Sequence, residues 1–215
     1  MGVEAKNWLH ASWSAPVAAL LFLTRSPCLI ALGLIVVAFC AYSVFSALTR
    51  RAMSRWATAM GCSAVDPTSH EWPWQSLHLR GTSRVVQAWS GDIEGLPVTF
   101  GEVTWSDGAF GGAVVDRFGR GTFVVVGLAQ TQPPMAARLP YTFIGDSPRL
   151  EQPALRHAFR IMEIPPFTVR DTVLFTVEPR QSGFEPGEVY RAVRRALHVV
   201  RLLDVGPDRP LAPAG

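Results

Sequence analysis

The chain has 215 residues, of which 48% are hydrophobic, and a formal net charge of +3. Residues 1–60 hold five basic residues against one glutamate, a net charge of +4, so the other 155 residues, with 15 basic and 16 acidic groups, carry a net charge of −1. A domain so close to neutral lacks the basic surface that nucleic-acid binding requires, and no nucleic-acid partner is expected. Its size suits one domain with its own core.

A long apolar segment lies near the N-terminus, with no charged residue between Ser26 and Thr49. As a helix its 22 residues would extend about 33 Å, which fits the hydrocarbon core of one bilayer. A secretory signal has a shorter apolar region followed by small residues, whereas arginines follow here. The sequence therefore predicts a transmembrane helix over residues 26–49, and the lipid bilayer as a partner.

Basic residues flank this segment unequally, because Arg25 precedes it and Arg50, Arg51 and Arg55 follow it. The positive-inside rule then places the rest of the chain in the cytoplasm. Arginines can also anchor a helix end at the interface in either orientation, so an outward-facing domain stays an alternative. These three arginines and Trp56 form the predicted membrane interface.

Residues 50–61 are predicted to form a juxtamembrane amphipathic helix that ends at Gly61. Met53, Trp56 and Met60 share one face of it at helical spacing. That face could lie on anionic lipid or pack on the domain. Packing on the domain is favoured, because a helix this short needs tertiary support.

The domain is predicted to cover residues 62–206 and to begin with a loop containing Trp72 and Trp74. These tryptophans could contact lipid headgroups, but covering an edge of the core is the favoured interpretation. Alternating and β-branched patterns then predict strands at Arg84–Ser90, Leu96–Trp105, Ala113–Phe118 and Thr122–Leu128. The apolar parity changes across Gly101, which indicates a bulge, and Asp107-Gly108 indicates a hairpin. The last three of these strands, joined at Asp107-Gly108 and by a second turn at Gly119-Arg120-Gly121, form a predicted antiparallel three-stranded meander.

Two helices and a hairpin are predicted after the meander. Pro153 can open a helix whose buried stripe is Leu155, Phe159 and Met162. A hairpin is expected around Arg170-Asp171. The last helix starts at Pro186 and ends at Gly206-Pro207, and its buried stripe consists of Val189, Val193, Ala196, Leu197, Val200 and Leu203. Antiparallel strands closed by a helix define an α+β fold.

The two ends of the chain are expected to lie outside the folded domain. Residues 1–25 are predicted to be an interfacial or poorly ordered lead, with a membrane helix continuing from Pro16 as the alternative. Residues 207–215 are predicted to be a disordered tail.

Most catalytic and metal-binding signatures are missing from the sequence. Lys6 is the only lysine, which excludes a Walker A loop, and neither a C-x-x-C nor an H-E-x-x-H motif occurs. Cys62 is the only cysteine outside the apolar segment, so no disulfide can form within the domain. No cofactor and no metal are therefore predicted.

One string has a catalytic alternative, because Tyr141–Ser147 ends in Gly-Asp-Ser and resembles the nucleophile block of GDSL-type esterases. That family also uses an asparagine and a D-x-x-H motif. The only asparagine here is Asn7, and no D-x-x-H follows. A hydrolase with an unfamiliar site around Asp146, Ser147 and His157 stays an alternative, and a simple Asp-Ser-Pro turn is favoured.

A second resemblance covers residues 50–206. Its motifs are W-A-x-x-x-G at Trp56–Gly61, V-V-Q-A-W-S-G followed by G-L-P-V-T-F from Gly95, and F-V-V-V with Leu139-Pro140 after it. In these features the chain resembles a group of uncharacterised, single-span membrane-anchored proteins of GC-rich bacteria. The resemblance implies architecture and no site. The predicted function is a non-enzymatic, membrane-tethered interaction or scaffold domain with a membrane or cytoplasmic protein partner; an outward-facing binding module is the alternative.

Overall fold

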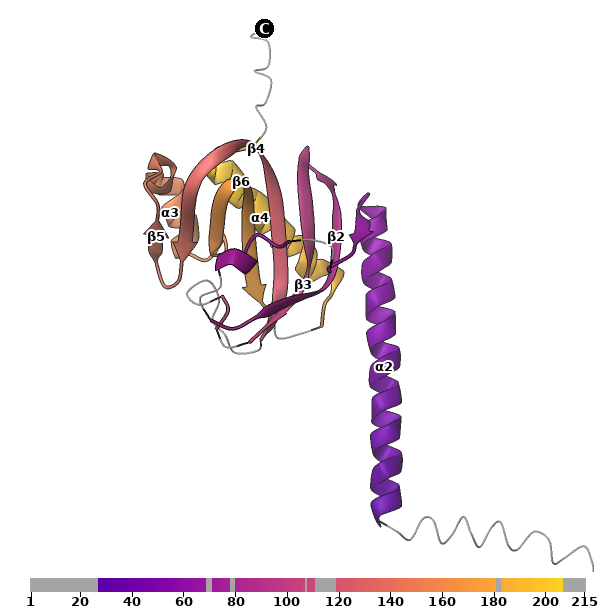
Figure 1. The fold of residues 1–215 in the computed structure, drawn as a ribbon. Helices are drawn as coiled ribbons and strands as arrows, with labels where there is room; N and C mark the ends of the chain where they lie inside the picture. The colour runs from indigo at the N-terminus through magenta and orange to yellow at the C-terminus, as the bar shows by residue number, and fades with distance from the viewer. Residues whose placement is uncertain are drawn as a thin grey trace, which may run out of the picture. The chain divides into compact units, whose positions relative to one another are not determined.

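The computed structural model describes residues 27–68, 71–77, 80–106, 108–110, 119–180 and 183–206, so the predicted lead and tail lie outside it. Its elements are α2 (Pro27–Ala59), β1 (Ser63–Val65), η1 (Gln75–Leu77), β2 (Ser83–Ile93), β3 (Leu96–Trp105), β4 (Arg120–Arg138), β5 (Thr142–Ile144), η2 (Pro148–Glu151), α3 (Pro153–Arg160), β6 (Phe167–Pro179) and α4 (Pro186–Leu203). An apolar helix is followed by an antiparallel sheet and a closing helix, which confirms the α+β fold (Figure 1).

The chain divides into two compact units, Met1–Leu48 and Thr49–Gly215, and α2 contributes to both. The residues predicted as membrane helix and as juxtamembrane helix form one uninterrupted helix from Pro27 to Ala59. It ends as the sequence indicates: Gly61 has φ 76°, and the Cys62 N–H donates to the Ala57 carbonyl at 2.9 Å. This is a Schellman motif, in which glycine supplies the left-handed residue.

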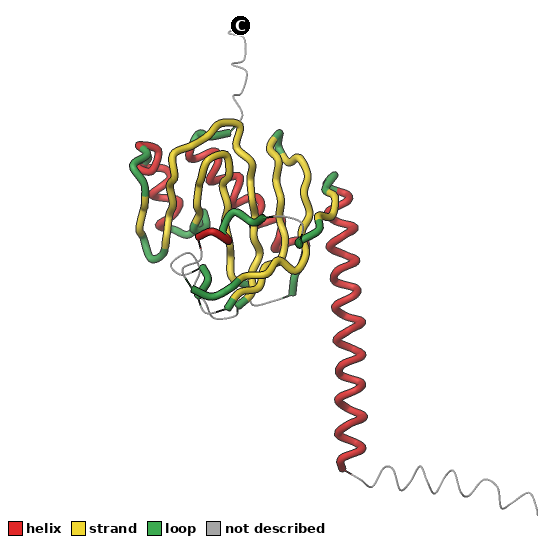
Figure 2. The backbone as a smooth tube through the Cα atoms, viewed as in Figure 1, coloured by secondary structure: helices red, strands yellow, loops and turns green. Residues whose placement is uncertain are grey.

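The sheet has the strand order β1-β2-β3-β4-β5, and β6 pairs with β4. β2, β3 and β4 are consecutive antiparallel neighbours, so an antiparallel meander is present (Figure 2). Its strands are not the predicted three, because Leu96–Trp105 pairs directly with the strand that begins at Arg120, and Gly121 lies within β4 and not in a turn. Of the predicted β3–β4 connection, Asp107 and the strand at Ala113–Phe118 lie outside the described residues. β4 itself, with 19 residues, is much longer than the predicted strand, because polar Gln130 and Gln132 interrupt its apolar pattern without ending it.

The predicted bulge at Gly101 is wrong in its position. β3 pairs with β4 without a register shift, and the irregularity lies in β2, between Val85 and Gln87. The apolar parity of β3 changes because its two halves face different cores: Phe100 belongs to one buried cluster and Val103 to the other. Gly101 is needed for a different reason, since a Cβ there would lie 2.7 Å from the Phe123 ring.

The predicted hairpin at Arg170-Asp171 is also wrong, because β6 is a single bent strand. It pairs with β4 from Phe167 to Pro179. Asp171 adopts φ 53°, which Asp tolerates better than most residues, and the register shifts on both sides of it. The turn signal therefore bends the strand and does not reverse it.

The larger core lies between one face of the sheet and α4, with α3 and the last turns of α2 beside it. Every residue of the predicted α4 stripe is buried, as is Met53 of α2. α4 ends at Asp204, in the left-handed conformation, two residues before the predicted Gly206. In α3, Leu155 and Phe159 are buried as predicted, but Met162 is not: it ends the helix with φ 59° and is 48% exposed.

A smaller aromatic core covers the opposite face of the sheet, where the segment containing η1 crosses the strands (Figure 1). Trp72 and Trp74 stack at 5.5 Å between ring centroids, and both contact Phe123. Trp74 is 1% exposed and donates its indole N–H to Ser83. Of the two interpretations of these tryptophans, packing on the core is the one that the structure shows.

Candidate functional site

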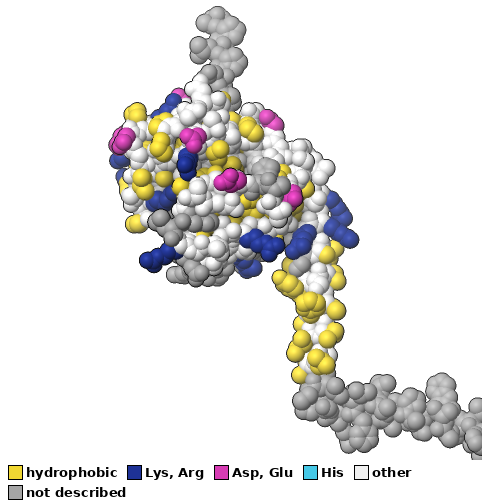
Figure 3. Space-filling model, in the orientation of Figure 1, with side chains coloured by type: hydrophobic (Ala, Val, Ile, Leu, Met, Phe, Trp, Pro, Cys, Tyr) yellow, Lys and Arg dark blue, Asp and Glu magenta, His cyan; other side chains and the backbone are white. Residues whose placement is uncertain are grey.

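The predicted membrane-interface residues divide into two groups on α2. Arg50, Arg51 and Arg55 are exposed, whereas Trp56 is half-buried, and its ring meets Phe100 edge-on at 5.6 Å. Figure 3 shows hydrophobic side chains along α2 and basic side chains at its C-terminal end. The segment Ile30–Ala59 is long and apolar enough to cross a bilayer, by length and composition, and its most apolar window is not buried by protein. The three arginines are thus exposed to the surroundings of the helix, while Trp56 contacts the domain.

The Gly-Asp-Ser string ends a turn that leads into η2. Ser147 is 6% exposed and its carbonyl accepts the Leu150 N–H at 3.0 Å, while Asp146 and His157 are exposed. Within the described residues, no hydrogen bond joins Ser147 to a histidine. The hydrogen bonds of Ser147 therefore match the turn interpretation of this string.

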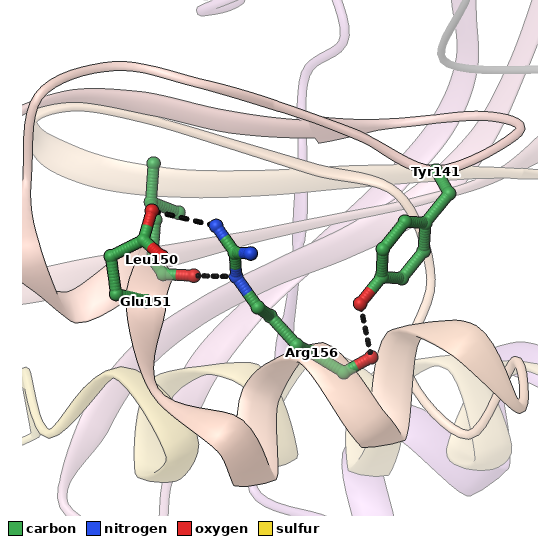
Figure 4. A network of polar contacts seen from close by, with 4 residues as sticks. All are labelled: Tyr141, Leu150, Glu151 and Arg156. Carbon is green, nitrogen blue, oxygen red and sulfur yellow. Dashed lines mark hydrogen bonds and ion pairs between the residues drawn. The ribbon is translucent and has the colours of Figure 1, made fainter.

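The polar contacts near this turn hold the backbone in place. Arg156 donates from Nε to the Leu150 carbonyl at 3.0 Å and from Nη2 to Glu151 at 2.6 Å, and the Tyr141 hydroxyl donates to the Arg156 carbonyl at 3.3 Å (Figure 4). Two of the three acceptors are main-chain carbonyls. The network connects η2 and α3 to the segment before β5, so its role is to stabilise the fold.

The single cysteine of the domain is inaccessible. Cys62 is 4% exposed, and a Cβ on Gly91 would lie only 2.6 Å from its Sγ. Burial raises the pKa of the Cys62 thiol, so the reactive thiolate is disfavoured. Among the described residues, no three His, Cys, Asp or Glu side chains are grouped so that they could hold a metal ion.

A row of polar side chains crosses four strands on the face that α4 covers. Gln87 of β2 pairs in register with Glu102 of β3, Glu102 with Thr122 of β4, and Thr122 with Glu178 of β6. Arg180, directly after β6, has the same parity as Glu178 and is itself fixed by its N–H bond to the Arg120 carbonyl at 3.1 Å. We call these residues the polar row, defined as Gln87, Glu102, Thr122, Glu178 and Arg180. Strand pairing aligns them, although they are up to 93 positions apart in the sequence.

Arg195 of α4 joins the polar row to α3 and uses every nitrogen of its guanidinium. Nη1 pairs with Glu178, Nε donates to the Glu163 carbonyl at 3.0 Å, and Nη2 donates to the Met162 carbonyl at 2.9 Å. The last two acceptors are carbonyls that follow the end of α3. Arg195 thus connects α4, β6 and the α3 terminus, and each of its guanidinium nitrogens has a partner.

Arg180 is bound differently, because only one of its guanidinium nitrogens has a partner. Nη2 pairs with Glu102, whose other oxygen accepts from Gln87 Nε2 at 3.0 Å, and the guanidinium lies 4.9 Å from the Phe184 ring centre. The side chain is 6% exposed. Nε and Nη1 are buried and without a hydrogen-bond partner among the described residues, as is Glu178 Oε1. Buried donors left unpaired are costly, so this arrangement requires an explanation.

A cavity of about 100 Å³ lies at this place, between α4 and the ends of β4 and β6. It is lined by Thr122, Glu178, Pro179, Arg180, Glu188, Arg191, Ala192 and Arg195. Burial raises the pKa of Glu178; Arg195 works against this shift and the neighbouring Glu188 adds to it. The candidate site is therefore a small polar cavity with a partly unpaired arginine and a carboxyl group whose pKa is raised by burial.

This site was not predicted from the sequence. Its one available signal was charge at inward positions: Glu178 follows Leu174 and Thr176 in the parity of the buried face. The register between β3, β4 and β6 depends on long-range pairing that a single sequence does not contain, so neighbours such as Glu102 and Arg180 could not be recognised.

Fold and site together define a class of protein. An apolar N-terminal helix precedes a small α+β domain, and this domain has a charged cavity beside its C-terminal helix. No protein-family model matches the sequence, and no curated protein matches it either. Among solved structures, the chain is similar to the mycobacterial trehalose monomycolate transport factor A, with a TM-score of 0.48 and 10% sequence identity; the alignment covers 75% of this chain and 97% of that one. A similarity of this size says nothing about ligand, partner or activity.

Proposed function

We propose that this protein is a membrane-tethered, non-enzymatic interaction or scaffold domain at the cytoplasmic face of a bacterial membrane. The observation that carries the proposal is α2. Its apolar part presents side chains such as Leu34, Val37 and Phe39, each of which is at least 65% exposed and would meet water outside a membrane. A helix that is hydrophobic all round is stable in a bilayer and unfavourable in water.

The C-terminal turns of the same helix belong to the domain. Met53 and Ala57 are fully buried in the larger core, and Arg50, Arg51 and Arg55 remain exposed. The apolar segment and these turns are parts of one helix that continues through Ala59. The domain thus follows the span closely in sequence, as suits a partner that is itself at the membrane. The resemblance to membrane-anchored proteins of GC-rich bacteria points in the same direction and stays a prediction.

Extraction of membranes with alkaline carbonate tests the tether. The full chain is expected to stay with the membrane pellet, whereas the double variant Leu34→Arg, Val37→Arg is expected to move to the soluble fraction. Each arginine at the centre of a span costs about 2.5–3.5 kcal/mol. The matched variant Leu34→Ala, Val37→Ala should behave like the unchanged chain. If the arginine variant stays in the pellet with the unchanged chain, α2 is not the anchor.

A further inference from the structure

The polar cavity under α4 has the features of a ligand site and lies wholly within the domain, so its interpretation does not depend on the membrane anchor. Three arginines line it against two glutamates, Glu178 and Glu188. Arg191 pairs with Glu188 at 3.0 Å, and Arg195 pairs with Glu178. Arg180 pairs with Glu102, which lies outside the lining. Each of the three arginines therefore has one carboxylate partner, and the partner of Arg180 is the one that does not line the cavity.

The unpaired atoms at the cavity are mostly donors. Arg180 is more than nine-tenths buried, and its Nε and Nη1 have no partner among the described residues. Arg195 of α4 differs from Arg180 in this respect, because each of its three guanidinium nitrogens has a bonding partner. A guanidinium with free N–H groups in a low-dielectric pocket is a strong donor for oxyanions. The Thr122 hydroxyl, on the same wall, can add another donor.

Glu178 Oε1 is the unpaired acceptor. Its protonation state determines whether the cavity can bind an anion. As a carboxylate it would repel an anion. Once protonated it becomes a donor, while Oε2 keeps its contact with Arg195. We propose that the cavity binds a small oxyanion, a phosphate or sulfate group in particular, with Arg180 as its main donor and Glu178 protonated in the complex.

The charged groups near Glu178 belong to α4, to β3 and to the chain after α3. α4 presents Arg191, Arg195 and Glu188, and β3 presents Glu102, which is held by Arg180. The chain after α3 contributes Glu163, whose carboxylate lies 3.4 Å from His198 and whose carbonyl binds Arg195. Because burial is the largest influence on Glu178 and raises its pKa, taking up a proton from solvent is the easiest way to admit an anion.

The size of the cavity limits what enters it. A volume of about 100 Å³ has room for about three water molecules at their share of liquid volume, and thus for a phosphate-sized group but not for a nucleotide. The group could be a free ion, or it could be the terminal phosphate of a larger molecule such as a lipid headgroup. Both present the same oxygens to Arg180.

Calorimetric titration of the full chain in detergent micelles with sodium sulfate, at constant ionic strength, tests the proposal. Sulfate stays fully ionised between pH 5 and 8, so any pH dependence belongs to the protein. Binding is expected to strengthen as the pH falls, approaching about tenfold per pH unit where Glu178 titrates, with up to one proton taken up per sulfate. Two buffers of different ionisation enthalpy count that proton.

Two variants assign the effect to residues. Glu178→Gln fixes a neutral side chain, so it should bind sulfate at pH 7.5 more tightly than the unchanged chain does and show no pH dependence. Arg180→Gln should weaken binding about tenfold or more. Glu151→Gln and Arg201→Gln remove exposed charges outside the lining and should change nothing. Circular dichroism checks that each variant is folded.

The source of the group follows from two further titrations, with glycerol 3-phosphate and with vesicles of phosphatidic acid compared with phosphatidylcholine. Binding of the first alone assigns a soluble ligand, and a preference for phosphatidic acid that Arg180→Gln removes assigns a lipid. The proposal is overturned if sulfate does not bind at pH 5, or if Glu178→Gln leaves binding and its pH dependence unchanged. Binding that survives Arg180→Gln in a folded variant would also overturn it.

Discussion

Glu178 is held in a part of the domain where burial disfavours its charge. Because its pKa is raised on folding, the folded state keeps the proton to higher pH than the unfolded state does. The folded state therefore binds more protons than the unfolded state between the two pKa values, and stability falls as the pH rises through that window. Above the folded pKa the loss is complete and the contribution becomes constant.

This sign gives a prediction for urea unfolding of the full chain in micelles, followed by tryptophan fluorescence. The free energy of unfolding of Glu178→Gln, minus that of the unchanged chain, should increase as the pH is raised from about 4.3, the ordinary glutamate pKa. Glu151→Gln, an exposed glutamate, should show no such trend. A difference that decreases with pH would mean that the ion pair with Arg195 outweighs burial.

Individual residues also show where sequence reasoning succeeds and where it stops. Gly61 correctly predicted the end of α2, because the left-handed backbone conformation favours glycine and this signal is local in the sequence. Met162 adopts a similar φ without a residue type that indicates it, whereas Asp171 was recognised as a turn signal but not as a bend within one strand. A positive φ at these positions is imposed by tertiary structure, the pairing of β6 with β4 and the contact of the α3 end with Arg195.

Among the elements, α4 is attached to its surroundings by packing and by polar contacts, of which those of Arg195 are the most numerous. Its buried stripe was predictable from periodicity, but the role of Arg195 was not, since that requires knowing which carbonyls lie opposite. The partners of Arg195 come from β6 and from the end of α3. The long strands illustrate the same limit: β6 was divided into a hairpin because only its pairing with β4 shows that it continues.

Replacing Arg195 by glutamine should destabilise the domain by about 2–4 kcal/mol, because two carbonyl acceptors and the buried Glu178 carboxylate would lose their partner. Arg194→Gln is the matched control, since Arg194 is the exposed neighbour on the same helix, and it should cost less than about 0.5 kcal/mol. Urea unfolding at pH 7 measures both. Equal effects of the two substitutions would show that Arg195 is not a structural clamp.

For the whole molecule, the uneven charge of the sequence follows the boundary between the apolar helix with its flanking arginines and the folded domain. The net +4 belongs to residues 1–60, where three exposed arginines follow the apolar segment, and the near-neutral remainder folds around two cores. The apolar helix, β2, β3 and the closing helix were all readable from periodicity. The polar cavity was not, because it is assembled from β3, β4, β6 and α4 at once.

The central claim, a domain tethered at the cytoplasmic face, is tested most directly by cysteine labelling in intact cells. Buried Cys62 is unsuitable as a reporter, so the three native cysteines are replaced by alanine and Ala154→Cys is introduced on the exposed side of α3. A membrane-impermeant thiol reagent should label this cysteine only after the cells are permeabilised. A cysteine at Ala11, before the span, should be labelled without permeabilisation. Labelling of Ala154→Cys in intact cells would contradict the proposed orientation and place the domain outside.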